Sequence, residues 1–309
     1  MRIGIFGTGA VGGYFGGRLA LAGNETIFIA RGEHLRALQQ SGLRVESIKG
    51  DFHIYPVLVT DDPDQVGQVD AVLFCVKAWQ VIEAASAMKH MLGSDSFVIP
   101  LGNGVEIPMQ LSQILGSKYV LGGLCRISSI FVEPGLIRHV GIEPYIAFGE
   151  LDGRDSQRVT DMHKIFTRAG IKADISANIQ VDMWLKFLFI ASLSGLGAIT
   201  RTPASIFRNI PETHSLLESA LAEIVAVAEA QGIKMPNDSV VKTLAIIDTL
   251  PDGVLASMHR DMIEGRPSEL EYQNGTIVRL GREYGIATPV HEFIYKCLLP
   301  QEKIARREI

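Results

Sequence analysis

The sequence predicts an α/β protein in which a doubly wound parallel sheet is followed by an all-α domain. Strand and helix patterns alternate over residues 1–177, which is typical of a doubly wound sheet. Strand patterns then end near Asn178, and helical patterns occupy residues 178–309. The length of 309 residues agrees with two domains of ~150 residues each.

The elements of the first domain follow in the order that this alternation requires. We expect strands at residues 1–6, 25–30, 43–47, 53–60, 70–76, 96–101, 120–132, 145–148 and 172–175. Helical patterns lie between them at 13–22, 33–41, 80–92, 105–115 and 156–169. The run 70–76 is continuously apolar, as expected for a strand that is buried on both faces. The late strands predict some antiparallel additions to the sheet.

The second domain contains helical patterns alone. They cover residues 179–196, 203–207, 211–231, 238–249, 269–284 and 289–297. Gly232 follows one of them and is a natural stop for a helix.

A glycine fingerprint opens the chain between the first strand and the first helix. Gly7 permits a tight turn, Gly9 lets the backbone approach a pyrophosphate, and Gly12 lets the helix pack closely on the strand. The helix N-terminus offers N–H groups to the phosphates. We therefore predict a Rossmann-type dinucleotide site, whose loop consists of Gly7, Thr8, Gly9, Ala10, Val11 and Gly12.

The second strand indicates which dinucleotide binds. Arg31 follows it, 19 positions after Gly12 (31 − 12). An acid about 20 residues on would hold the ribose 2′-OH of NAD, whereas an arginine suits the 2′-phosphate of NADP. Glu33 lies close enough to keep NAD open, and a solvated arginine at a helix start is the other interpretation. The sequence favours NADP.

Composition excludes several partners. The net charge is −5 and basic residues gather only in the tail Lys303–Arg307, which argues against nucleic acid. The apolar stretch Phe187–Ile199 is shorter than the ~20 residues of a membrane span. Cys75, Cys125 and Cys297 have no CxxC spacing, which indicates a reducing compartment and a cytoplasmic protein.

Two polar side chains follow strands at the edge where open α/β sheets bind ligands. Lys77 comes directly after the strand 70–76. Asn103 lies between two glycines after the strand 96–101, where the backbone can approach a ligand. An ordinary turn asparagine is an equally good interpretation of Asn103.

The helical domain carries further candidates. Lys186 lies in an otherwise apolar helix, so its ammonium must snorkel, pair or face a cavity. Ser268 is placed to cap a helix, with Glu271 as the acid three residues on. Glu269 and Glu271 then face different sides of that helix, and each is compatible with an ordinary first-turn acid.

No metal site is predicted. The segment beginning at His291 starts like HExxH but has Tyr295 where the second histidine must stand. None of the eight histidines is paired at metal-ligand spacing.

Taken in order, these segments resemble the ketopantoate reductase family over nearly the whole chain. The segments KAWQV at 77–81 and RPSELE at 266–271 are more specific than the fingerprint. The resemblance implies NADPH-dependent reduction of the 2-oxo group of 2-dehydropantoate to pantoate, in pantothenate and coenzyme A biosynthesis. A small 2-oxo acid is therefore the expected partner, and the chain is compatible with a homodimer.

The resemblance also assigns roles. Lys186 would be the general acid that protonates the developing alkoxide. Glu269 would bind the substrate hydroxyl or the cofactor ribose and help to position Lys186. Ser257 would hold the substrate carboxylate, and Asn103 and Lys77 would contact the nicotinamide side of the cofactor and the substrate.

The sequence departs from the family on the lysine helix. The family pattern expects asparagines four and eight residues after the lysine, where this chain has Ile190 and Ser194. We keep Ser194 among the substrate residues, although losing one buried hydrogen bond costs ~1–3 kcal/mol. A less polar 2-oxo acid is therefore an alternative substrate. A non-catalytic NADPH-binding sensor is another alternative, against which the retention of Lys186 and Glu269 argues.

Overall fold

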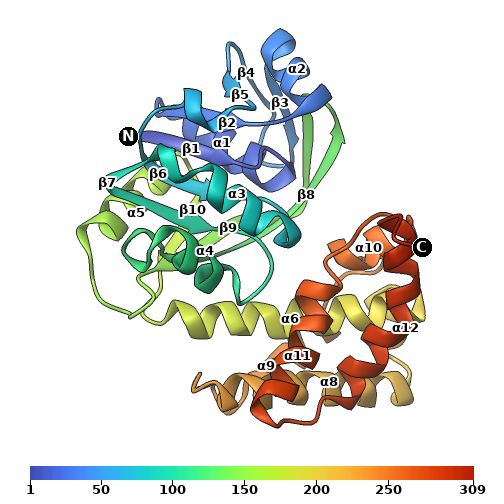
Figure 1. The fold of residues 1–309 in the computed structure, drawn as a ribbon. Coiled ribbons are helices and arrows are strands. Elements are labelled where there is room, and N and C mark those ends of the chain that lie inside the picture. The colour runs from blue at the N-terminus through green and yellow to red at the C-terminus, as the bar shows by residue number, and fades with distance from the viewer. The chain divides into compact units, whose positions relative to one another are not determined.

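A computed structural model describes all 309 residues. The chain divides into two compact units, Met1–Asp182 and Met183–Ile309. Strands occur only in the first unit, in blue to green in Figure 1, and the second is built from helices, in yellow to red. The predicted class, a parallel α/β sheet followed by an all-α domain, is confirmed.

The first sheet is entirely parallel. Its strands, in spatial order, are β5 (Leu58–Thr60), β2 (Glu25–Ile29), β1 (Arg2–Phe6), β6 (Val69–Phe74) and β7 (Leu92–Pro100). The chain runs outward from β1 to β2 and β5, then crosses to β6 on the other side of β1. The strand order therefore reverses between β1 and β6, the point at which such sheets bind ligands.

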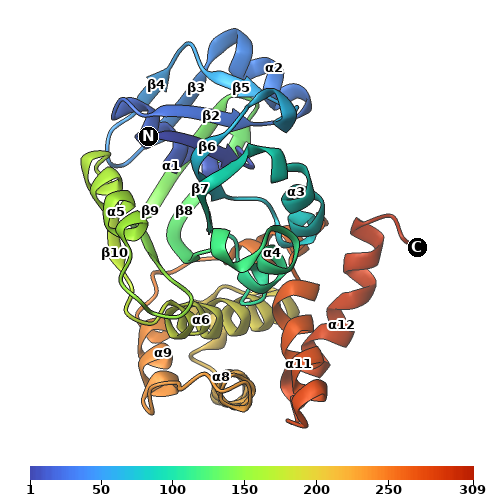
Figure 2. The same cartoon turned by 60° about the vertical axis from the view of Figure 1, so that its left-hand side comes forward.

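A second sheet corrects the expectation of a single one. It contains β10 (Lys172–Ile175), β9 (Leu136–Gly149), β3 (Leu43–Ser47), β4 (Phe52–Ile54) and β8 (Gly122–Glu133). The expected strand at 53–60 is in fact two strands in different sheets, separated by Pro56, which cannot donate to a ladder. Figure 2 shows β8 and β9 running side by side as one long antiparallel hairpin, which turns at Gly135 with φ +84°.

Helices of the first unit connect these strands. They are α1 (Ala10–Leu21), α2 (Gly32–Ser41), α3 (Val81–Ala87), α4 (Ile107–Leu115) and α5 (Gln157–Arg168), with 3₁₀ turns at Pro63–Gln65, Ala78–Gln80, Lys89–Met91 and Ser117–Tyr119. The helix expected at 80–92 is therefore shorter than predicted, with a 3₁₀ turn on each side.

Helix α1 approaches both sheets closely at glycine positions of its buried faces. A Cβ at Gly16 would lie 2.7 Å from Ile5 of β1 and from Phe28 of β2. A Cβ at Gly13 would clash with Ile137 of β9. Because both positions are glycine, one helix can lie in close contact with the two sheets.

The second unit contains the end of one long helix and all the helices that follow. The helices are α6 (Ile179–Thr200), which begins in the first unit, α7 (Ala204–Phe207), α8 (Pro211–Ala230), α9 (Ser239–Asp248), α10 (Ser257–Ile263), α11 (Thr276–Tyr284) and α12 (Pro289–Ala305). The sequence did not predict α10, and α12 continues past Pro300 beyond its expected end. A π-helical segment, Glu271–Gly275, replaces the first turns of the helix expected at 269–284.

By length and composition, α6 could cross a membrane. It has 22 residues, and an 18-residue window reaches a mean hydropathy of 1.5. The stretch Phe187–Ile199 is only part of this helix, so the apolar length is greater than the sequence pattern indicates. In the structure 67% of that window is buried inside the protein, which is typical of the core helix of a soluble protein.

The N-terminus of α12 is fixed by a buried polar network. The carboxylate of Glu223 accepts the N–H groups of Val290 at 2.7 Å and His291 at 3.0 Å. The ring of His291 donates from Nε2 to the carbonyl of Ala220 at 3.0 Å, so Nδ1 accepts from the Asn274 amide at 2.9 Å. Burial lowers the pKa of His291 to about 4.

We expect this histidine to make stability depend on pH. The unfolded imidazole takes up a proton near pH 6.5, whereas the folded one does so only near pH 4. The unfolded state therefore binds more protons between these values, and the free energy of unfolding falls as the pH decreases. Linkage gives a loss of about 2 kcal/mol between pH 7 and pH 5 from this group.

Urea unfolding at both pH values would measure the effect, with His291→Gln as the comparison. Burial raises the pKa of Glu223, which gives a pH dependence of opposite sign that the variant retains. The native protein should lose about 2 kcal/mol more than the variant over this range. An equal loss in both proteins would exclude His291 as the cause.

Candidate active site

The loop between β1 and α1 forms a cradle that only glycine permits. Gly7 has φ +95°, and a Cβ there would lie 2.9 Å from the backbone of Cys75 and Val76. A Cβ at Gly9 would meet nothing within 4 Å, so the backbone at Gly9 faces open space. Gly9 is also the N-cap of α1, and no side chain caps this helix. The positive end of α1 is therefore available to an anion, and the residues fit a pyrophosphate.

The remaining residues of the loop contribute through their backbone. Thr8 is buried, and both its N–H (3.2 Å) and its hydroxyl (2.9 Å) donate to the carbonyl of Ile29. Its side chain therefore ties the loop to the end of β2. Ala10 and Val11 are half-buried in the first turn of α1. A Cβ at Gly12 would clash with the carbonyl oxygen of Gly7, so only glycine fits there.

Arg31 lies where the sequence placed it, just after β2 and at the N-cap of α2. Its Nη1 forms an ion pair of 3.0 Å with Glu83 of α3, and the two side chains are 60% and 66% exposed. Exposed ion pairs of this kind contribute about 0–1 kcal/mol, so a phosphate can replace the carboxylate. Glu33 is exposed in the first turn of α2.

Lys77 and Asn103 follow neighbouring strands at the same edge of the sheet. Phe6 pairs with Phe74, and Phe74 pairs with Pro100, so β1, β6 and β7 end together. The structure therefore brings the glycine loop, Lys77 and Asn103 to one edge.

The surroundings of these two residues differ. The Lys77 ammonium lies 5.6 Å from the centre of the Trp79 ring, a cation–π contact. Asn103 is half-buried, and a Cβ at the preceding Gly102 would lie 3.4 Å from the carbonyl of Val76. The loops after β6 and β7 are therefore in contact beside the glycine loop.

In the second unit, Lys186, Ile190 and Ser194 share one face of α6, because residues four apart lie above one another on a helix. Lys186 and Ile190 are half-buried. Ser194 is fully buried, and its hydroxyl makes no hydrogen bond within the chain. The lysine thus lies beside an apolar side chain where the family pattern has an amide.

Glu269 and Ser257 come from separate segments of the second unit. Glu269 is 3% exposed at the start of the π-helical region, and Ser257 is half-buried at the first residue of α10. Glu271 points outward and accepts the hydroxyl of Tyr295 at 2.5 Å. The two glutamates therefore face different sides, as expected.

The predicted capping box at Ser268 is wrong in its partner. The hydroxyl of Ser268 accepts the N–H of Leu270 at 3.2 Å, as a cap would. The carboxylate that accepts the N–H and the hydroxyl of Ser268 is that of Glu302 of α12, not Glu271. A residue 34 positions away gave no signal at sequence level.

Three buried polar side chains of the second unit escaped the sequence analysis. His259, Gln273 and Asn274 are each at most 2% exposed and carry atoms without a hydrogen-bond partner in the chain. Asn274 packs against Gly195 and His259 against Gly197, so small residues of α6 make room for them. Burial lowers the pKa of His259, which keeps the ring neutral. In the sequence, each of the three lies among apolar residues with ordinary helical spacing, so nothing marked them as candidates.

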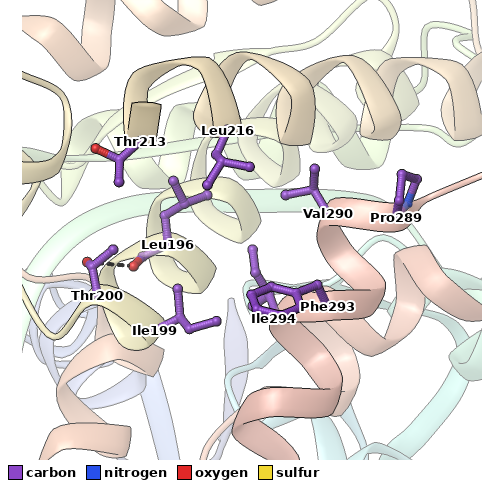
Figure 3. Close-up of a pocket in the computed structure, with 9 residues that line it drawn as sticks. All are labelled: Leu196, Ile199, Thr200, Thr213, Leu216, Pro289, Val290, Phe293 and Ile294. Carbon is purple, nitrogen blue, oxygen red and sulfur yellow. Dashed lines mark hydrogen bonds between the residues drawn. The ribbon is translucent and has the colours of Figure 1, made fainter. Parts of the chain in front are cut away.

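An apolar pocket of the second unit contains none of the predicted residues. Its volume is about 200 Å³, and Figure 3 shows its lining. The lining residues are Leu196, Ile199, Thr200, Thr213, Leu216, Pro289, Val290, Phe293 and Ile294. No titratable group lines it, and the Thr200 hydroxyl donates a hydrogen bond to the carbonyl of Leu196 at 2.7 Å.

No group of three His, Cys, Asp or Glu residues in the structure could hold a metal ion.

Comparison with family models matches both parts of the chain. The model described as ketopantoate reductase PanE/ApbA matches residues 3–153. The model described as the C-terminal part of ketopantoate reductase PanE/ApbA matches residues 178–302.

Individual proteins are similar over almost their full lengths. A 2-dehydropantoate 2-reductase of Halobacterium salinarum is 29% identical, covering 94% of this chain and 95% of that protein. An uncharacterized oxidoreductase of Bacillus subtilis, YkpB, is 29% identical, covering 96% and 97%. The crystal structure of a PanE/ApbA family ketopantoate reductase from Ralstonia eutropha superimposes with a TM-score of 0.91 at 32% identity, covering 99% and 100%.

Proposed function

Because the chain belongs to the ketopantoate reductase family, we propose that it reduces the 2-oxo group of 2-dehydropantoate to pantoate with NADPH. The family makes it an oxidoreductase that reduces 2-oxo acids and uses a nicotinamide dinucleotide. The observation that carries the proposal is the occurrence, in one chain, of a dinucleotide cradle and a lysine on an apolar helix. Binding the cofactor alone would not require Lys186.

The cofactor is held by residues of the first unit. The uncapped N-terminus of α1 and the open backbone at Gly9 receive the pyrophosphate. Arg31 exchanges the Glu83 carboxylate for the 2′-phosphate, with which it forms a charge-assisted bond. Lys77 and Asn103 contact the nicotinamide end and the substrate.

The chemistry needs one hydride and one proton. Reduced nicotinamide supplies the hydride to C2 of the 2-oxo acid. Lys186 gives its proton to the oxygen that gains negative charge, so it stabilises a charge that exists only in the transition state. Glu269 orients the substrate and Lys186, and Ser257 holds the carboxylate. The product is a 2-hydroxy acid.

A second substrate class is favoured by the face of α6. Ile190 cannot hydrogen-bond a hydroxyl, and Ser194 is fully buried. A 2-oxo acid without the hydroxyl would therefore suit this face at least as well as 2-dehydropantoate. The free cysteines, Cys75, Cys125 and Cys297, agree with a reducing, cytoplasmic location for either reaction.

The cofactor preference provides the first test of this function. Arg31→Ala should weaken NADPH binding roughly 10- to 100-fold, since a bond to a charged group contributes about 1.5–3 kcal/mol. NADH binding should remain nearly unchanged. Fluorescence titration with both cofactors measures this, and Arg36→Ala, an exposed arginine of the same helix, is the matched control. Equal losses for NADPH and NADH would show that Arg31 does not read the phosphate.

Substrate choice is tested with a pair of 2-oxo acids. With Ile190 on the lysine face, 2-dehydropantoate should have little advantage in kcat/KM over its deoxy analogue, 2-oxo-3,3-dimethylbutanoate. Ile190→Asn together with Ser194→Asn should raise that advantage roughly 5- to 150-fold, which corresponds to the free energy of one buried hydrogen bond. Because Ser194 is fully buried, Ile190→Asn alone is measured as well.

The outcome separates the two substrate classes. A strong preference of the native protein for 2-dehydropantoate would show that other residues recognise the hydroxyl. It would also exclude the less polar substrate.

The proton donor is tested by removing Lys186. Lys186→Ala should lower the rate of hydride transfer ~10²- to 10⁴-fold while NADPH binding changes little. Lys186→Arg should rescue poorly, because a guanidinium keeps the charge but does not readily release a proton. Single-turnover NADPH oxidation measures the rate, with the exposed Lys242→Ala as control. A near-native rate in Lys186→Ala would remove Lys186 from the mechanism and favour the sensor.

A further inference from the structure

Every backbone and side-chain polar group of Ser268, the residue before Glu269, is held by the end of α12. Its N–H donates to Glu302 at 3.0 and 3.1 Å, and its hydroxyl donates to the same carboxylate at 2.5 Å. Its carbonyl accepts from Arg306 at 2.8 Å. Ser268 is fully buried and Glu302 is 4% exposed. The serine is thus fixed by Glu302 of α12 and by Arg306, the residue that caps the end of this helix.

The charge of Glu302 is balanced within this network. Arg306 donates from Nε to the carboxylate at 2.6 Å and from Nη2 to the serine carbonyl. Bonds between charged groups are shorter and stronger than neutral ones, and a buried carboxylate requires such a partner. Replacing a buried ion pair by apolar residues is often neutral or stabilising. Stability alone therefore gives no reason for this arrangement.

The network acts on the backbone on both sides of Glu269. The Ser268 hydroxyl accepts the N–H of Leu270 at 3.2 Å while donating to Glu302. The carbonyl of Glu269 then accepts the N–H of Gln273 at 2.9 Å, where the π-helical segment begins. Glu269 lies at the junction of a loop and this segment, outside any regular helix, and π-helical turns are frequent at functional sites. Fixing its neighbours fixes the backbone position from which its carboxylate projects.

We propose that Glu302 and Arg306 are positioning residues that hold Glu269 through Ser268. They contact neither substrate nor cofactor in this role. The inference rests on the proposed function, in which Glu269 contacts the substrate, and it assigns a catalytic consequence to the end of α12.

The first test is the loss of the carboxylate. Glu302→Gln keeps the shape of the side chain but loses the charge that Arg306 requires. We expect kcat for a 2-oxo acid to fall at least tenfold, with NADPH binding changed less than twofold. Hydrogen exchange, followed by mass spectrometry of the full chain with NADPH, should become faster at residues 268–275. Glu292→Gln is the matched control, since Glu292 is a half-buried glutamate of the same helix whose carboxylate pairs with Lys296 and Arg282 and not with Ser268.

A double-mutant cycle distinguishes positioning from general weakening. If Glu302 acts through Glu269, Glu302→Gln should cause no further loss of kcat in a Glu269→Gln background. The same fold loss in both backgrounds would overturn the proposal, as would unchanged exchange at residues 268–275. If Glu302→Gln does not fold, Arg306→Gln, at a half-buried position, takes its place with the same criteria.

The exchange experiment also separates this inference from the proposed function. Should the native chain oxidise no NADPH with any 2-oxo acid, the proposed function fails. Faster exchange in Glu302→Gln would then still show that the network orders the segment, and unchanged exchange would refute the network as well.

Discussion

The close packing of α1 against two sheets is the constraint on which the first unit depends. Gly16 faces the parallel sheet at Ile5 and Phe28, and Gly13 faces Ile137 of the second sheet. A methyl group at either position would force the side chains of these residues to shift. The N-terminus of the same helix forms the proposed phosphate cradle, so its packing on the sheets also sets the position of that cradle.

The sequence predicted those parts of the fold that are encoded locally. The strand at 70–76 is buried on both faces and therefore reads as a continuous apolar run. The second sheet could not be predicted in the same way, because β3 is half polar and pairs Arg44 with Leu136, far along the chain. The π-helical segment was missed because its buried residues keep a helical pattern.

The residues of the candidate site also differ in whether the local sequence indicates them. The candidate cofactor residues follow from the sequence because they stand at fixed distances from strand ends, as Gly9 and Arg31 do, and their role stays a prediction. Glu269 was identified through resemblance, since its composition is that of any first-turn acid. The bond from Ser268 to Glu302 joins residues 34 positions apart, and nothing local in the sequence distinguishes the buried Glu302 from the half-buried Glu292 of the same helix.

The ion pair between Arg31 and Glu83 has a consequence for the proposed cofactor site. The Glu83 carboxylate pairs with the guanidinium in the structure, so binding of a 2′-phosphate at the proposed site would exchange one anion for another. A neutral residue at position 83 would leave the guanidinium without a competitor. In the proposed site, position 83, which lies outside every dinucleotide motif, would therefore adjust how strongly one phosphate group separates two otherwise identical cofactors.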